Sequence, residues 1–150
     1  MTTVNRMQGM SMREWFFFLA VVALSSTLLV VPAAGTAEPV RVGVTASLTG
    51  AYAAPGSNLL EGLKMWAHDV NSRGALLGRT VEIVYYDDQS DPATSARLYE
   101  KLISDDRVDL LIGPYASDVT LAASDVAERH DFPMVSGSAS ATGIWSRGYR

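Results

Sequence analysis

Short β-branched segments alternate with helical segments along the part of the chain that follows residue 37. The segments predicted as strands are 40–46, 80–86, 108–112 and 132–135. Between them, apolar residues recur at spacings of three and four, which predicts helices of about 12 to 16 residues. This alternation is typical of parallel strands joined by right-handed crossovers. The sequence therefore predicts an α/β fold with a doubly wound parallel sheet.

The first predicted helix follows a loop rich in glycine, alanine and proline that runs through Gly56. Asn58 and Glu61 have the spacing of a capping box, which predicts that the helix starts there. Asn71 and Gly74 supply stop signals. The face predicted to be buried consists of Leu59, Leu63, Trp66, Ala67 and Val70.

The next two helices also carry start signals. Asp91 followed by Pro92 predicts a helix that runs to about Ser104, because the aspartate can cap it and proline at the first helical position loses no needed donor. The third helix is predicted to be capped by Ser117 or Asp118.

The N-terminal 37 residues predict a secretory signal peptide. Arg6 and Arg13 precede an uncharged run over residues 15–31, and small residues follow it as far as Ala37. A basic start, an apolar middle and small residues are the parts of such a peptide, and we expect cleavage after Ala37 and export to the periplasm. The alternative is a retained membrane helix, although the run is short for a bilayer core of roughly 30 Å and Pro32 ends it. The absence of cysteine argues against a lipoprotein anchor.

Composition and motifs exclude several classes of function. The formal net charge is −4, and the dispersed lysines and arginines form no footprint for nucleic acid. Without cysteine the chain has no disulfide and no thiolate metal site. His68 and His130 fall in predicted helices, and neither a G-x-S-x-G elbow nor a phosphate-binding glycine motif occurs. We therefore expect a protein that is not an enzyme and has no cofactor.

A ligand is expected beyond the carboxyl ends of the strands, as in other open parallel sheets. The loops that lie there are predicted to be 47–57, 87–91, 113–118 and 136–143. Ser117 begins a helix, where free N–H groups and the helix dipole suit a carboxylate. The alternative is that Ser117 only caps its helix.

Three further features of these loops have two readings each. The small and hydroxylated residues of 136–143 either let a ligand approach or form an ordinary strand-to-helix loop. Tyr52 either forms a pocket wall or is an exposed loop tyrosine. Asp87 and Asp88 resemble a metal corner, but capping and turn formation is the better interpretation because the neighbouring loops offer no further carboxylates.

Five segments carry a resemblance to a known family. Residues 42–150 resemble the Leu/Ile/Val-binding proteins of bacterial ABC importers, which are type I periplasmic binding proteins. The order and spacing of the segments make the match specific. The segments are Leu48–Tyr52, Asn71–Arg79, Tyr86–Pro92, Leu111–Pro114 and Arg147–Tyr149.

The resemblance implies a two-lobed clamp that closes on an amino acid or a similar small acid and delivers it to the permease of an ABC transporter. Residues 38–150 would then be the N-terminal lobe, with the second lobe missing from this chain. In the family a serine hydroxyl at the start of the third helix holds the ligand carboxylate, and the loop after the fourth strand holds the carboxylate and the ammonium. The ligand-binding residues expected on these grounds are Ser117, Ser138, Ala139 and Ser140, together with Tyr115 and Tyr52 in the adjoining loops.

The chain departs from the family pattern at two places. Ser90 and Ala116 replace the two cysteines that form a disulfide in some members. Pro55 stands where an aromatic wall can occur, so amides, urea and aromatic acids stay open as ligands beside the branched-chain amino acids. The same fold also serves as the ligand-sensing ectodomain of membrane receptors, which is the alternative function.

Overall fold

Four parallel strands form the centre of the computed structural model, which describes residues 37–149. The sheet has the order β2-β1-β3-β4, and every neighbouring pair is parallel. The predicted α/β class and parallel sheet are confirmed. The strands are β1 (Val40–Ala46), β2 (Val81–Asp87), β3 (Leu110–Ile112) and β4 (Met134–Val135).

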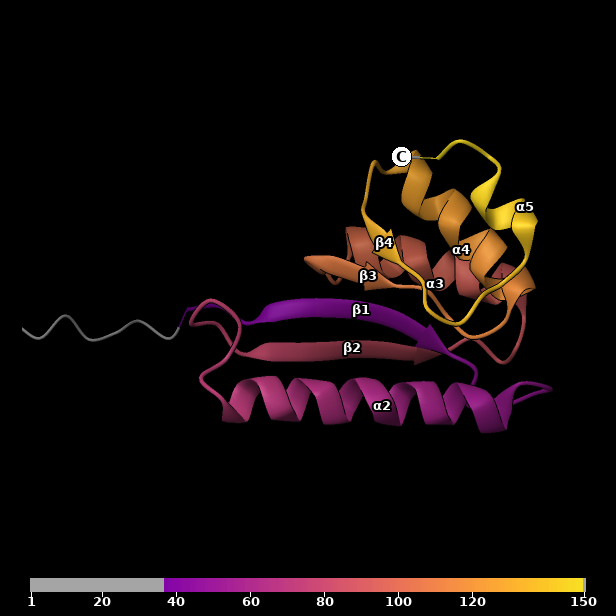
Figure 1. Ribbon diagram of the computed structural model, residues 1–150. Coiled ribbons are helices and arrows are strands. Elements are labelled where there is room, and N and C mark those ends of the chain that lie inside the picture. Colours follow the sequence, from indigo (N-terminus) through magenta and orange to yellow (C-terminus); the bar gives the residue numbers. More distant parts are fainter. Residues whose placement is uncertain (1–36, 150) are drawn as a thin grey trace, which may run out of the picture. The chain divides into compact units, whose positions relative to one another are not determined.

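Helices cover both faces of this sheet (Figure 1). The long helix α2 packs on β1 and β2 from one side, whereas α3, α4 and the short α5 lie on the other side. The helices are α2 (Ala53–Ser72), α3 (Pro92–Ser104), α4 (Ser117–Arg129) and α5 (Thr142–Trp145). All of them belong to one compact unit, Thr36–Arg150.

Strand β1 is buried on both faces, as expected for a central parallel strand. Its residues Val42 and Val44 pack towards α2, where Leu60 and Ala67 complete two small apolar clusters. On the other face, the main cluster joins α3, β3 and α4. That cluster is made of Tyr99, Leu102, Val108, Leu111, Ala123, Val126 and Ala127.

Helix α2 begins earlier than the sequence predicted. It starts at Ala53, so the loop predicted through Gly56 and the capping box of Asn58 and Glu61 are wrong. Proline and glycine suggested a loop, but Pro55 lies in the first turn, where its missing N–H loses no helical bond. Gly56 is buried because the helix crosses the end of β1 closely. A Cβ atom on Gly56 would lie 2.2 Å from the carbonyl oxygen of Ser47.

The buried face of α2 agrees with the predicted one in part. Gly56, Leu60 and Ala67 are its buried residues, and the predicted Trp66 is 41% exposed. The predicted face was therefore right for Ala67, which is buried, and for Leu63 and Val70, which are partly buried and pack on the clusters beneath the helix, but wrong for Trp66.

The capping prediction for α3 is confirmed. The Asp91 side chain accepts a hydrogen bond of 2.8 Å from the Thr94 N–H, and Pro92 is the first helical residue. Strands β3 and β4 are shorter than predicted. The Val108 N–H bonds the Leu102 carbonyl instead of a strand, and Pro133 has no N–H to offer to β4.

The close crossing of α2 over β1 gives a direct test. We expect Gly56→Ala to lower the free energy of unfolding by about 1–3 kcal/mol, because the added methyl group forces the helix away from the strand. In the matched control Gly62→Ala the Cβ atom meets nothing within 4 Å, so this helix substitution should raise stability by about 0.5–1 kcal/mol. Urea unfolding measures both, and equal changes in the two variants would contradict the packing.

Candidate ligand-binding site

A buried carboxylate joins the carboxyl ends of β1 and β2. Asp88 is fully buried and accepts hydrogen bonds from the hydroxyls of Thr45 and Ser47, at 2.8 and 2.6 Å. The Ser90 N–H donates to the same side chain at 3.0 Å, and the Thr45 hydroxyl also contacts that of Ser95 at 2.9 Å. These donors offset the cost of burying the charge and hold the loops after both strands.

The neighbouring Asp87 organises the loop after β1. Its carboxylate accepts hydrogen bonds from the N–H groups of Leu48 and Gln89, at 2.9 and 2.8 Å, and from the Thr49 hydroxyl at 2.8 Å. Burial raises the pKa of Asp87, but these hydrogen bonds to the ionised form outweigh it, and the pKa lies below its ordinary value of 3.8. Both aspartates therefore form turns, as predicted. Within residues 37–149 no cluster of acidic residues and histidines is placed to bind a metal ion.

This network places Tyr52 beside the start of α4. The Tyr52 N–H donates to the Ser90 hydroxyl at 3.0 Å. Its ring meets that of Tyr115 nearly edge-on, with centroids 5.9 Å apart and an angle of 62° between the planes. The Tyr52 hydroxyl donates to Asp118 at 3.3 Å, and the negative charge of that carboxylate raises the pKa of Tyr52. Two aromatic rings from separate loops thus form one corner at the strand ends.

Helix α4 starts without the predicted side-chain cap. Its cap position is Ala116, and neither Ser117 nor Asp118 bonds the backbone as a cap, so that prediction was wrong. Ala116 has a φ of 71°, a conformation uncommon for a residue with a side chain. The loop is held in place by the Thr120 hydroxyl, which donates to the Pro114 carbonyl at 3.0 Å. Ser117 is therefore the first helical residue, and its hydroxyl is available for other contacts.

The Ser117 hydroxyl faces the loop after β4. Its oxygen accepts hydrogen bonds from the N–H groups of Ser140 and Ala141, at 3.3 and 3.2 Å. Both contacts use lone pairs of the oxygen, which leaves its single hydrogen available to an acceptor. The first N–H groups of α4 have no partner within the helix. An acceptor that carries negative charge therefore suits this place.

The structure brings four of the six predicted residues into two contacts. Ser117 bonds the backbone of Ser140, and Tyr52 packs on Tyr115, two residues before Ser117. Ser138 and Ala139 precede Ser140 in the same loop, and their contact with a ligand stays a prediction.

The sequence analysis missed the N–H of Ala141 and the burial of Asp88. Nothing in the sequence signals a backbone contact such as that of Ala141. For Asp88 a signal existed, because hydroxyl residues at alternate positions, Thr45 and Ser47, end the neighbouring strand. Asp118, offered above only as a possible cap, is exposed in the first turn of α4 and accepts the hydrogen bond from Tyr52.

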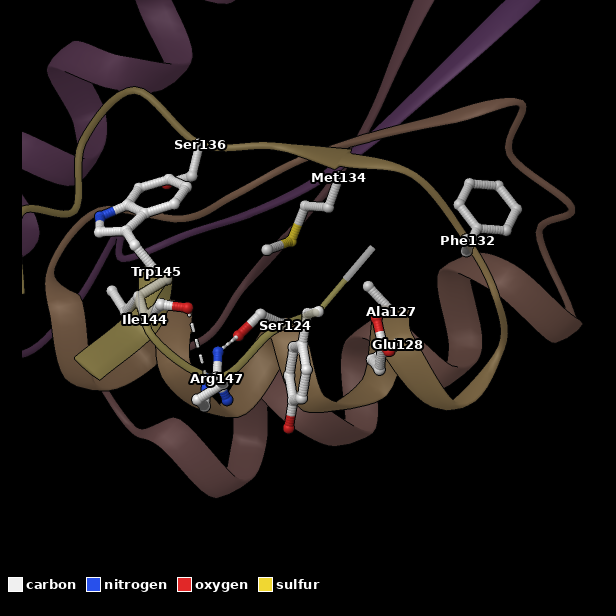
Figure 2. Close-up of a pocket in the computed structure, with 10 residues that line it drawn as sticks. Ser124, Ala127, Glu128, Phe132, Met134, Ser136, Ile144, Trp145 and Arg147 are labelled. Atoms are coloured by element: carbon white, nitrogen blue, oxygen red, sulfur yellow. Dashed lines mark hydrogen bonds between the residues drawn. The ribbon is translucent and has the colours of Figure 1, made fainter. Parts of the chain in front are cut away.

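A separate hollow of about 260 Å³ lies between α4, β4 and the chain around α5 (Figure 2). Met134, Ile144, Trp145 and Arg147 are among the residues that line it. Ser136 also lines it, and the oxygen of its side chain is buried without a hydrogen-bond partner among the described residues. No pattern in the sequence indicates this hollow.

Comparison with known proteins identifies the family. Residues 39–149 match the model of the family described as periplasmic binding protein. The chain belongs to the periplasmic binding protein family. The Leu/Ile/Val-binding protein of Escherichia coli K12 is 31% identical to it over 114 residues, which are 76% of this chain and 31% of the relative. The resemblance stated from the sequence is thereby confirmed.

Solved structures show the same fold. The branched-chain amino acid transporter substrate-binding protein of Streptococcus pneumoniae, in complex with isoleucine, has a TM-score of 0.68 and 27% identity over 71% of this chain and 30% of its own. A solute-binding protein of an ABC transporter from R. palustris, in complex with benzoate, has a TM-score of 0.62 and 31% identity over 69% of this chain and 28% of its own. The chain thus spans less than a third of the length of these periplasmic binding proteins. The names of these relatives are those of binding proteins, in line with the expectation that the chain is not an enzyme.

The residues that precede the fold lie outside the family match, which begins at residue 39. The predicted signal peptide, 1–37, falls almost wholly outside the described residues. Within the described part of the chain, none of the helices combines the length and apolar character that a membrane span needs.

The hydrogen bonds of Asp87 predict a dependence of stability on pH. Its pKa is lower in the folded protein than the ordinary 3.8, so its ionised form stabilises the fold above that value, and this contribution is lost as the pH falls through the lowered pKa. We expect Asp87→Asn to cost about 1 kcal/mol near pH 6, a modest amount because solvent screens the partly exposed carboxylate. The difference between wild type and variant should vanish near pH 2. A difference that is constant across this range, in urea unfolding at each pH, would contradict the assignment.

Proposed function

We propose that residues 38–150 are the N-terminal lobe of an extracytoplasmic solute-binding protein. The protein captures an amino acid, or a related small acid or amide, between two lobes without covalent chemistry, and delivers it to the permease of an ABC importer. Residues 1–37 are its signal peptide, which directs it to the periplasm. The family match and the names of the relatives support this assignment.

The observation that carries the proposal is the contact between the Ser117 hydroxyl and the loop after β4. Ser117 stands at the start of α4, at the carboxyl end of a parallel sheet, which is where ligands of such folds bind. The ligand carboxylate accepts the free hydrogen of this hydroxyl and bonds the N–H groups at the start of the helix. Each such charge-assisted hydrogen bond contributes about 1.5–3 kcal/mol.

The two ligands named for the structural relatives support a carboxylate as the common element. One relative is in complex with isoleucine and another with benzoate, and these molecules share a carboxylate but differ in the rest. In this chain, Ser117 and the backbone of Ser138 and Ala139 hold the carboxylate end, and Ser140, whose N–H bonds the Ser117 hydroxyl, contributes its own hydroxyl. The remainder of the ligand lies against the aromatic corner of Tyr52 and Tyr115, which are half-buried and in edge-on contact.

Calorimetric titration of the full-length gene product tests this function. The panel contains L-leucine, L-isoleucine, L-valine, their amides, urea and benzoate. We expect one class to bind, and Ser117→Ala to weaken its binding by about 10- to 100-fold through the loss of one hydrogen bond to a charged group.

The matched control is Ser72→Ala, which removes an exposed hydroxyl that bonds the Asp69 carbonyl at the far end of α2. It should bind as the wild type does. If no compound binds to the wild-type protein, the proposed function is wrong. If Ser117→Ala binds as tightly as Ser72→Ala, the ligand site is wrongly placed.

A further inference from the structure

One arginine fastens the C-terminal part of the described chain to α4. The guanidinium of Arg147 donates hydrogen bonds to the Ser124 hydroxyl and to the Asp125 carboxylate on that helix. Figure 2 shows Arg147 turned towards Ser124. Longer contacts of 3.5 Å reach the carbonyls of Leu121 and Ile144. A single planar group thus bridges α4 and the end of α5.

Tyr149 adds two further contacts to this attachment of Arg147 to α4, which we call the Arg147 contact. Its ring lies against the guanidinium of Arg147, 4.2 Å from ring centroid to central carbon, and its hydroxyl donates to Asp125 at 2.8 Å. The hydrogen bond to Asp125 raises the pKa of Tyr149. Only 20% of the Arg147 side chain is exposed, although arginine is seldom buried without partners. The guanidinium of Arg147 is therefore held in one position by these partners.

The Arg147 contact and the proposed site for the ligand carboxylate both use helix α4. Ser117 is its first residue, and Leu121, Ser124 and Asp125 follow on one face at helical spacing. One end of the loop that carries Ser138–Ser140 is fixed by β4, where the Gly113 N–H bonds the Val135 carbonyl at 2.8 Å. The other end is α5.

The position of α5 decides where the loop amides point. Ala141 is the cap residue of α5, and its carbonyl accepts the Ile144 N–H at 3.0 Å. The N–H of the same residue donates to the Ser117 hydroxyl. A rotation of α5 on α4 would therefore move this amide away from Ser117.

We propose that Arg147 is a positioning residue of the ligand site, which holds α5 on α4 so that the N–H groups of Ser140 and Ala141 face the Ser117 hydroxyl. The inference rests on the proposed function for its effect on affinity. Arg147 acts through α5 and the loop, not by contact with the ligand. The buried side chain of Ile144, 7% exposed, keeps α5 attached when the arginine is removed, so the loss is one of orientation.

The test compares Arg147→Ala and Arg147→Lys with a matched control on α4, the helix that Arg147 contacts. The control is Arg129→Ala, which removes an arginine whose ion pair with Glu100 measures 2.6 Å and which lies at the other end of α4 from Ser117. The first readout is amide hydrogen exchange of Ser140 and Ala141 by NMR on the full-length protein without ligand. We expect exchange about tenfold faster in Arg147→Ala and an intermediate rate in Arg147→Lys, because lysine keeps the charge but not the planar fork.

The second readout is the Kd for L-leucine, L-isoleucine and benzoate by calorimetry. We expect about tenfold weaker binding in Arg147→Ala and wild-type binding in Arg129→Ala. Exchange rates and affinity in Arg147→Ala that match those of Arg129→Ala would overturn the positioning role. Failure of the wild-type protein to bind any of these probes would instead contradict the proposed function, and the exchange rates would still decide the role of Arg147.

Discussion

The buried carboxylate of Asp88 ties together the carboxyl ends of β1 and β2, beside which Tyr52 is placed. Its three donors come from the end of β1, from the residue after β1 and from the turn after β2. Burying the Asp88 side chain costs free energy unless such hydrogen-bond partners surround it. The loops after β1 and β2 therefore have little freedom to rearrange separately. Asp87, one residue earlier, holds the same two loops together through its bond from the Leu48 N–H. Tyr52 is placed by these two aspartates because its N–H bonds the Ser90 hydroxyl in the turn that they hold.

Helix α4 supplies the second frame of the site. Its first residue presents a hydroxyl to the loop after β4, and its second and third turns receive the guanidinium of Arg147. Both ends of the segment between β4 and residue 149 are therefore held against rigid elements, and the loop between them needs no side-chain contacts of its own. This arrangement explains how a loop of small residues can offer backbone N–H groups at a defined place. Such donors suit any small carboxylate, which fits a family whose members are solved with isoleucine and with benzoate.

The sequence predicted what depends on local patterns and missed what depends on packing. The parallel α/β sheet and the Asp91 cap followed from periodicity and residue type, and the structure confirms both. The start of α2 was misplaced because proline and glycine were interpreted as loop residues, whereas Gly56 is required by the close approach of Ser47. Ser117 was expected to cap α4, but the chain enters that helix through a left-handed Ala116, a conformation that no pattern reveals. The positioning role proposed for Arg147 was not predictable either, because its partners on α4 lie 22 and 23 residues away in the sequence.

The central claim is that the ligand carboxylate binds at the start of α4, between Ser117 and the loop after β4. A crystal structure of the full-length protein with the tightest-binding member of the ligand panel tests it most directly. The account predicts a carboxylate oxygen within about 3 Å of the Ser117 hydroxyl and of backbone N–H groups in this region, with the rest of the ligand against Tyr52 and Tyr115. A ligand held instead in the hollow beside Met134 and Trp145, with Ser117 still bonded only to the loop, would contradict it.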